Sequence, residues 1–532
     1  MKRISVRRVA SVIVTAMAMT LVFATLGWAM MPQWNTRPYT KHIVIASADT
    51  TITPAHANIP HEGRYRTRET RLSIKTGDGV TLPAVLREPV DAPGPRPACL
   101  FIHGSGTSGA EDFGDIANAM ASAGIVTLVP AKRNDNYTVL HRDYPRFARE
   151  YGRSLDVLRG RIGVDPAKTG IYAESEGTWI ATILTSKRQD IAFAVLTSAP
   201  VFNGREQMAM AVSAYTHEAG APKPVVKDMA KLMSLDYAPF DLAYADFDAD
   251  RYLKSLTMPV LVNYGTYDTA MPIEQGAQRI IATANKSGNE NVTVRYFAGN
   301  HQMRLVRLIH PNLPLAEGYT QALENWVNGV TAGTKADGWA TPQVAGATPH
   351  QRFAASQRTR SGIVGSLGVL AGLMVAGPVL IVMAAILGIG LTVFSWLQTL
   401  LAGRRSVATV RAVHATPSEL GAAQRRMLHG IAGLSAGIGT AVMVITGLLY
   451  GYMSAVGVSA VLVMPQPRLF AVGWVVLRIA TMLLVVLFAW EMERVWYCRA
   501  DIVGVRRVIC VMVALGTLAT LMTLAFWGLF SL

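Results

Sequence analysis

Apolar residues gather in five long stretches of this chain, one near its start and four after residue 350. The first stretch is Val9–Met31, which no charged residue interrupts. A helix needs about 20 mostly apolar residues to cross a bilayer, and each stretch is long enough. The pattern therefore predicts an N-terminal helix and a C-terminal transmembrane domain of about four helices. The C-terminal stretches are 362–402, 427–464, 469–490 and 508–531.

Short apolar runs alternate with segments of helical periodicity between about residues 65 and 335. The first two runs are joined by Gly77-Asp78-Gly79, a turn signal. Strands that alternate with helices are typical of parallel β-α-β units, in which helices cover both faces of a sheet. This region is therefore predicted to be an α/β domain. Its expected strands are Leu72–Lys75, Val80–Arg87, Ala98–Ile102, Ile125–Val129, Thr169–Ala173, Ala192–Thr197, Val260–Tyr264 and Thr293–Phe297.

One segment, 200–255, breaks the alternation and is rich in Met, Tyr, Asp and Pro, so it is predicted to be an inserted cap. The residues after 335 are rich in Ala, Thr, Gly and Gln, a composition typical of a linker. The predicted organisation is a basic N-terminus with an anchor helix at 1–36, the α/β domain at 37–335, a linker at 336–361 and the transmembrane domain at 362–532.

The basic excess of the chain, a formal net charge of +15, lies beside the apolar stretches. Residues 1–31 carry four basic residues and no acid, and residues 351–532 carry 14 arginines and four acids. The region between them is nearly neutral, which argues against nucleic-acid binding. Because basic residues flank membrane helices on the cytoplasmic side, we expect a multi-pass cell-membrane protein with a cytoplasmic N-terminus and an extracytoplasmic α/β domain.

Three details of the membrane region follow from the same pattern. The first apolar stretch is longer than that of a secretory signal and lacks a convincing cleavage site, which favours an uncleaved signal-anchor. In 362–402 one long helix is preferred to a hairpin broken at Gly377-Pro378, because a hairpin contradicts the charge signal of the N-terminus. Arg478 has two interpretations, a side chain that reaches the interface or a charge that binds lipid or substrate.

The three cysteines, Cys99, Cys498 and Cys510, indicate neither a disulfide framework nor a metal site, because no Cys/His group has the spacing of metal ligands. Cys99 begins an expected buried strand, where a free Cys is usually a small core residue. No metal and no cofactor is predicted.

A serine between two small residues follows one of the expected strands. The stretch Gly170–Ile180 reads GIYAESEGTWI, with Ser175 after an apolar run and ahead of a helical pattern that begins at Gly177. Small-x-Ser-x-Gly between a strand and a helix is the pattern of a nucleophile elbow, a sharp turn that exposes the serine Oγ. Ser175 is therefore the candidate nucleophile.

An acid and a histidine follow later strands in the order that such a serine requires. Asp268 comes after the strand PVLVNYG, and His301 comes after the strand VTVRYF. A nucleophilic serine needs a base to take its proton and a carboxylate to orient that base. Both residues are expected at the carboxyl ends of strands, where an open α/β sheet has its ligand crevice.

A glycine-containing loop ends the strand before the candidate elbow. Residues Leu100–Gly106 read LFIHGSG. The backbone N–H groups of Gly104, Ser105 and Gly106, with the N–H of Glu176 after the nucleophile, are the candidate oxyanion hole, since such donors stabilise the charge that develops on an attacked carbonyl.

With these motifs, residues 65–335 resemble the α/β-hydrolase superfamily, specifically serine esterases and peptidase-like hydrolases of the dienelactone-hydrolase and prolyl-oligopeptidase type. The resemblance implies an α/β-hydrolase fold with a cap, to which this chain adds transmembrane helices. It also implies Ser175 as nucleophile, His301 as base and Asp268 as the orienting acid. Ala173 stands where the family usually has glycine, and it is still small enough for the turn.

Several residues compete for these roles. Ser105 is a rival nucleophile, and Lys132 and Arg133 either face an anionic substrate or belong to a solvated loop. Glu174 is expected to pack or hydrogen-bond beneath the elbow. The rival acids, all in the predicted cap, are Asp241, Asp246, Asp248 and Asp250.

The sequence therefore predicts a membrane-anchored serine hydrolase that cleaves an acyl-ester substrate, small or lipidic, through an acyl-enzyme. Three alternatives stay open. An acyltransferase would use the same triad with an alcohol acceptor from lipid or envelope sugars, and a peptidase would need a pocket for a peptide amine. A transporter or membrane scaffold would carry a degenerate hydrolase domain. The expected partners are the ester substrate and membrane lipids.

Overall fold

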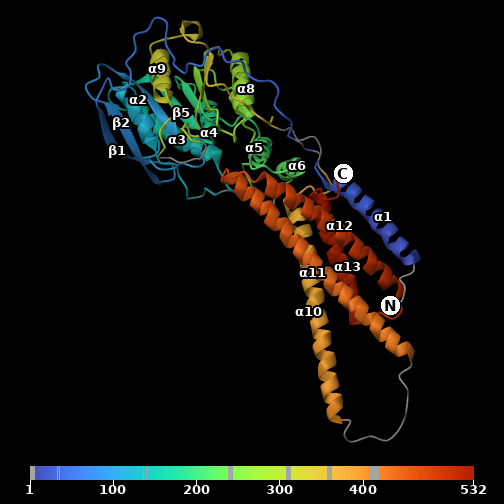
Figure 1. The fold of residues 1–532 in the computed structure, drawn as a ribbon. Helices are drawn as coiled ribbons and strands as arrows, with labels where there is room; N and C mark the ends of the chain where they lie inside the picture. The colour runs from blue at the N-terminus through green and yellow to red at the C-terminus, as the bar shows by residue number, and fades with distance from the viewer. Residues whose placement is uncertain are drawn as a thin grey trace. The chain divides into compact units, whose positions relative to one another are not determined.

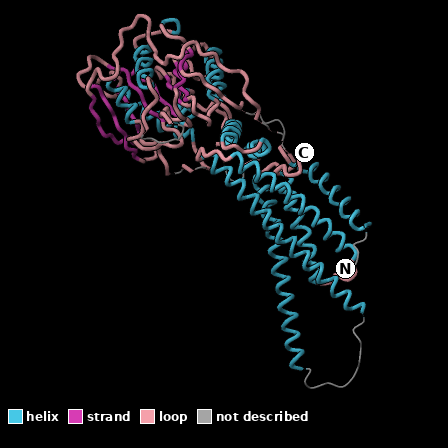
Figure 2. Tube along the Cα trace, in the orientation of Figure 1, coloured by secondary structure: helices cyan, strands magenta, loops and turns pink. Residues whose placement is uncertain are grey.

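The computed structural model describes residues 6–32, 34, 36–135, 137–138, 140–237, 242, 244–306, 313–355, 362–405 and 419–531. Internal contacts divide the chain into two compact units. The first, here called the sheet unit, is Trp34–Tyr215 with Phe240–Arg358. The second, the helical unit, is Met1–Gln33, Thr216–Pro239 and Thr359–Leu532. Figure 2 shows the strands gathered in one part of the chain, whereas the long helices belong to the other.

Nine strands among the described residues form one sheet, in the order β1-β2-β4-β3-β5-β6-β7-β8-β9. Strand β2 runs antiparallel to both β1 and β4, and the strands from β4 to β9 run parallel. All eight expected strands are present. Their bounds are β1 Thr67–Lys75, β2 Thr81–Pro89, β3 Arg96–Ile102, β4 Val126–Pro130, β5 Val164–Glu174, β6 Ala194–Thr197, β7 Val260–Gly265, β8 Val292–Phe297 and β9 Val344–Gly346.

Helices cover both faces of this sheet (Figure 1). Along β3, Leu100 and Ile102 pack with one set of helices, and Phe101 between them packs with the other. Such alternation follows from the two-residue period of a strand, and a strand buried on both faces is apolar throughout. The helices α3 Tyr144–Arg159, α4 Gly177–Thr185 and α8 Ile273–Lys286 cover the first face, and α2 Gly114–Ser122 and α9 Tyr319–Thr331 cover the second.

The segment predicted as a linker is partly structured, so that prediction was wrong in part. Strand β9 lies within 336–361 and pairs in parallel with β8, from Val294↔Val344 to Tyr296↔Gly346. The short 3-10 helix η3, Ala336–Gly338, precedes it. A three-residue strand has too few positions to show an apolar period, which explains why composition concealed it.

The predicted cap divides between the units. Helix α5, Gly204–Glu218, begins in the sheet unit, whereas α6, Lys223–Lys231, and the 3-10 helix η1, Leu232–Ser234, belong to the helical unit. The short helix α7, Asp250–Leu253, returns to the sheet unit. Lys231 is fully buried, and its Nζ donates to Asp228 Oδ1 at 2.8 Å and to the carbonyl oxygen of Phe526 at 2.5 Å.

Five described helices are long and apolar enough to cross a membrane, the number expected from the sequence. Helix α10 continues through Pro378 as one helix rather than a hairpin. The N-terminal helix α1 packs against α13, since a Cβ on Gly27 would lie 2.6 Å from the Ala525 carbonyl oxygen. Arg478 donates to the Ser531 carbonyl oxygen at 2.6 Å. The helices are α1 Val6–Met30, α10 Leu367–Arg405, α11 Glu419–Val461, α12 Pro467–Tyr497 and α13 Val505–Phe526.

Candidate active site

Ser175 occupies a strained turn between β5 and α4. Its φ is +54°, a left-handed conformation that is uncommon for residues other than glycine and costs about 1–3 kcal/mol. Its N–H donates to the Thr197 carbonyl oxygen at 2.8 Å, which ties the turn to β6. Gly177 opens α4, and a Cβ there would lie 2.6 Å from the Ile102 carbonyl oxygen. This glycine therefore allows the helix to start directly against β3, as a nucleophile elbow requires.

Asp268 and His301 are in direct contact, as the sequence predicted for an acid and its base. His301 Nδ1 lies 2.7 Å from Asp268 Oδ2. The other carboxylate oxygen of Asp268 accepts from the backbone N–H groups of Ala270 at 2.9 Å and Met271 at 3.2 Å. With Nδ1–H engaged by the carboxylate, the Nε2 atom of His301 is left as the acceptor for a proton.

The loops that carry these two residues are locked together by backbone contacts. Tyr267 N–H donates to the Gly299 carbonyl oxygen at 2.9 Å. A Cβ on Gly265 would lie 2.2 Å from the Asn300 carbonyl oxygen, so only glycine permits this approach. Ser198 Oγ donates to the His301 carbonyl oxygen at 2.7 Å. Sequence reasoning missed Ser198, although its position directly after β6 places it at the same edge of the sheet.

The loop after β3 approaches the candidate nucleophile. A Cβ on Gly104 would lie 3.0 Å from the Cβ of Ser175, while Ser105 and Gly106 are exposed. His103, the first residue of this loop, is fully buried, and its Nε2 lies 2.9 Å from the Pro130 carbonyl oxygen. Burial lowers the pKa of His103 to about 4. His103 is therefore a neutral core residue rather than a second base.

Glu174, the residue before Ser175, is a buried carboxyl group coupled to the histidine. Burial raises the pKa of Glu174 to about 7, against the opposing effect of His301. Burial lowers the pKa of His301, but Asp268 and Glu174 outweigh it, so the pKa of His301 lies above its ordinary value. Glu174 is therefore buried next to the candidate nucleophile, and its charge acts on the pKa of the candidate base.

The Glu176 side chain lies among four donors, which the sequence did not indicate. Its two oxygens accept from Lys132 at 3.2 Å, Arg142 at 2.5 Å, and the hydroxyls of Tyr137 and Tyr144 at 2.7 Å each. Burial raises the pKa of Glu176. The two cations and the two hydroxyls lower it by a larger amount, so the pKa of Glu176 lies below its ordinary value. Glu176 is held as a carboxylate.

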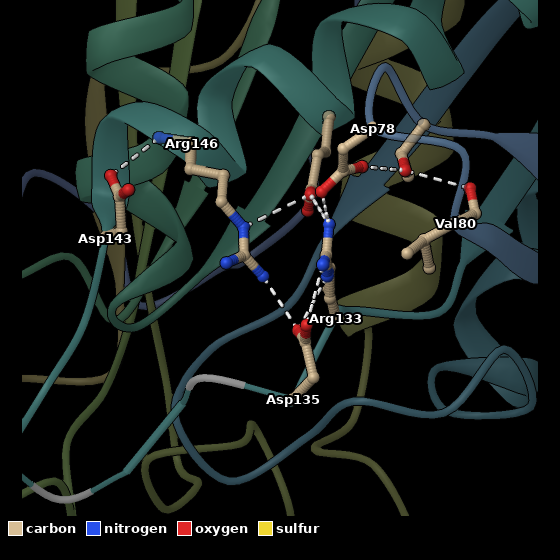
Figure 3. A network of polar contacts seen from close by, with 8 residues as sticks. Asp78, Val80, Arg133, Asp135, Asp143 and Arg146 are labelled. Atoms are coloured by element: carbon tan, nitrogen blue, oxygen red, sulfur yellow. Dashed lines mark hydrogen bonds and ion pairs between the residues drawn. The ribbon is translucent and has the colours of Figure 1, made fainter.

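Lys132 and Arg133 are each engaged by carboxylates of this chain, and for the buried Lys132 the prediction of a solvated loop was wrong. Lys132 is buried against Glu176. Arg133 bridges Asp78, Asp135 and Glu150. Arg146 reaches two of these acids, Glu150 and Asp135, and Figure 3 shows its contact with Asp135. A cation that follows a strand looks alike in sequence whether it binds substrate or an internal carboxylate.

Two of the rival acids pair with arginines in the described part of the chain. Asp246 pairs with Arg205, and Asp250 pairs with Arg279. Burial, with a smaller contribution from the nearby charge of Asp248, raises the pKa of Glu206 to about 7. Asp241 lies outside the described residues. Among the described residues no group of three His, Cys, Asp or Glu side chains gathers as a metal site, and Cys99 is a buried free thiol, as expected of a core residue.

Among the comparisons with known proteins, those of structure found a similarity to this chain, and those of sequence did not. No family model and no curated protein sequence matches it. Its structure is similar to a putative dienelactone hydrolase from Klebsiella pneumoniae, with 13% identity, 50% of this chain and 99% of that chain covered and a TM-score of 0.36. It is also similar to an esterase from Pyrococcus furiosus, with 16% identity, coverage of 53% and 96% and a TM-score of 0.35.

The fold class itself is set by the sheet of this chain. One antiparallel strand, β2, sits beside a parallel run with a crossed β4-β3 order, helices cover both faces, and an elbow follows β5. The sheet unit is an α/β-hydrolase fold, and the chain adds to it five helices that are long and apolar enough to span a membrane. The predicted fold class is confirmed.

Proposed function

We propose that this protein is a membrane-anchored serine hydrolase that cleaves ester substrates through an acyl-enzyme on Ser175. The observation that carries the proposal is the combination of a strained serine turn after β5 with the 2.7 Å contact between His301 and Asp268. Neither a structural turn nor a structural histidine needs this pairing at the carboxyl ends of neighbouring strands.

In the proposed reaction His301 Nε2 takes the proton of Ser175 as its Oγ attacks the acyl carbonyl. The resulting oxyanion is stabilised by the N–H of Glu176 and by N–H groups of the Gly104–Gly106 loop. His301 then gives its proton to the leaving alcohol, and the acyl-enzyme forms. Water, deprotonated by His301, then attacks the acyl group, and His301 returns this proton to Ser175 Oγ as the acid is released. Asp268 keeps the imidazole in the required tautomer throughout.

The proposed location is the cell membrane, with the N-terminus in the cytoplasm and the sheet unit outside. Basic residues precede α1, and the five arginines within residues 403–426 favour the cytoplasmic side for that segment. The tight packing of Gly27 against Ala525 supports retention of α1 as an anchor.

Labelling of the full-length protein with a fluorophosphonate probe tests the proposal. Wild-type protein should be labelled and should hydrolyse aryl esters, and Ser175→Ala should lose both while its apparent melting temperature is kept. Ser105→Ala is the matched control for the rival serine and should still be labelled. Full labelling of Ser175→Ala would remove Ser175 as the nucleophile. Adding alcohols and analysing products separates hydrolysis from acyl transfer.

A further inference from the structure

A single buried lysine joins the two elements of the candidate oxyanion hole. Lys132 is 5% exposed, and its Nζ donates to the Gly104 carbonyl oxygen at 2.8 Å and to Glu176 Oε2 at 3.2 Å. Its ammonium also lies 4.1 Å from the ring centroid of Tyr137. Gly104 belongs to the loop after β3, and Glu176 follows the nucleophile, so one side chain contacts both places from which oxyanion donors come.

The contact with Gly104 fixes the direction of a backbone donor. In a trans peptide the C=O and the N–H of the next residue lie in one plane and point in opposite directions, and no cis peptide occurs in the described chain. When Lys132 holds the Gly104 carbonyl oxygen, the N–H of Ser105 is therefore turned away from Lys132. Rotation of this peptide would break a charge-assisted hydrogen bond, which is stronger than a neutral one.

The contact with Glu176 acts on the second donor. The Glu176 carboxylate is held by Lys132, Arg142 and two tyrosine hydroxyls, which restrains the residue whose N–H is the other proposed donor. Removing a charged partner from such a buried group leaves the remaining charge poorly compensated. A change at Lys132 therefore loosens Glu176 and Gly104 together.

We infer that Lys132 is a positioning residue of the oxyanion hole, which sets the Gly104–Ser105 peptide and Glu176 in one arrangement for the tetrahedral intermediate. The inference rests on the proposed serine-hydrolase function. Lys132 touches neither substrate nor reacting atoms in this role. Its effect should therefore fall on the stability of the tetrahedral state rather than on binding of the planar ester.

The test compares Lys132→Met with Arg133→Met in the full-length protein. Each removes one cation after β4, but the carboxylates that Arg133 contacts in the described part of the chain are Asp78 and Asp135 (Figure 3) and Glu150. The measurements are kcat and KM for an aryl ester and Ki for a trifluoromethyl ketone, which forms a tetrahedral adduct with a serine. Loss of one oxyanion donor costs about 10²–10³ in kcat, and misplacement should cost about 10–100-fold.

For Lys132→Met we expect kcat to fall and the ketone Ki to rise by the same factor, with KM changed less than about three-fold. Arg133→Met should change each less than about two-fold. An unchanged Ki beside a lowered kcat, or wild-type values of both, would overturn the positioning role.

If Lys132→Met does not fold, Lys132→Arg keeps the charge and should show smaller, still parallel losses in kcat and ketone affinity. A loss in only one of them contradicts the inference. Wild-type protein that reacts with neither ester nor fluorophosphonate rejects the proposed function instead, so the two failures are distinguishable.

Discussion

Replacing Glu174 with glutamine should stabilise the protein at pH 8 and not at pH 4.5, although the residue adjoins the nucleophile. Burial raises the pKa of Glu174 to about 7 from an ordinary value of 4.5. Between these values the folded chain binds more protons than the unfolded chain, so the stability contributed by this group is present below pH 4.5 and is lost as pH rises through 7. Glutamine does not titrate and escapes the loss.

The interval between the two pKa values corresponds to a change of roughly 3 kcal/mol in the free energy of unfolding, at about 1.4 kcal/mol per pKa unit. For a domain of this size, that equals a difference of roughly 6 °C in melting temperature. The measurement is the apparent melting temperature of wild type and Glu174→Gln in the same detergent at pH 4.5 and pH 8. The effects of packing are the same at both pH values. The difference between the melting-temperature shift at pH 8 and the shift at pH 4.5 therefore measures the effect of the Glu174 charge.

Glu174→Gln should also move the acid limb of kcat/KM to lower pH, because Glu174 raises the pKa of His301. Glu324 provides a matched control, since burial raises its pKa to about 8 and α9 holds it on the far face of the sheet from α4. Glu324→Gln should gain stability at high pH and leave the pH profile of activity unchanged. Equal effects of Glu174→Gln on stability at both pH values would refute the reasoning.

Two further predictions concern the triad and the membrane. Asp268→Asn should lower kcat by roughly 10⁴, as the wrong tautomer does in a serine protease, and Asp246→Asn should leave kcat within about three-fold, with folding checked by a thermal melt. A large loss in Asp246→Asn with a neutral Asp268→Asn would move the acid into the predicted cap. A reporter fused after Gly403 should be cytoplasmic and one after Thr334 external, in accessibility assays on intact cells. Both reporters on one side would contradict the proposed external active site.

The α/β fold was predictable because each buried strand carries a continuous apolar run, and the site because its residues follow strands whose carboxyl ends share one edge. The contact between Asp268 and His301 was predictable in this way. Lys132 was not, because its partner Glu176 lies 44 residues away along the chain and no local pattern links them. The membership of α6 in the helical unit was equally hidden, since a short amphipathic helix does not reveal which unit covers its apolar face.

The assignment of α6 to the helical unit affects the order in which the chain can fold during synthesis. Residues 216–239 are synthesised before α10–α13, yet Lys231 finds its carbonyl partner only at Phe526, 295 residues later. Lys231 and Asp228, which are buried in the folded protein, therefore lack this partner while the remainder of the sheet unit is translated. During this interval Phe526, which supplies the carbonyl partner of Lys231, has not yet been synthesised. A protein truncated after residue 358 would lack Phe526 permanently. The solubility of this truncated protein would show the effect of the missing partner on α6.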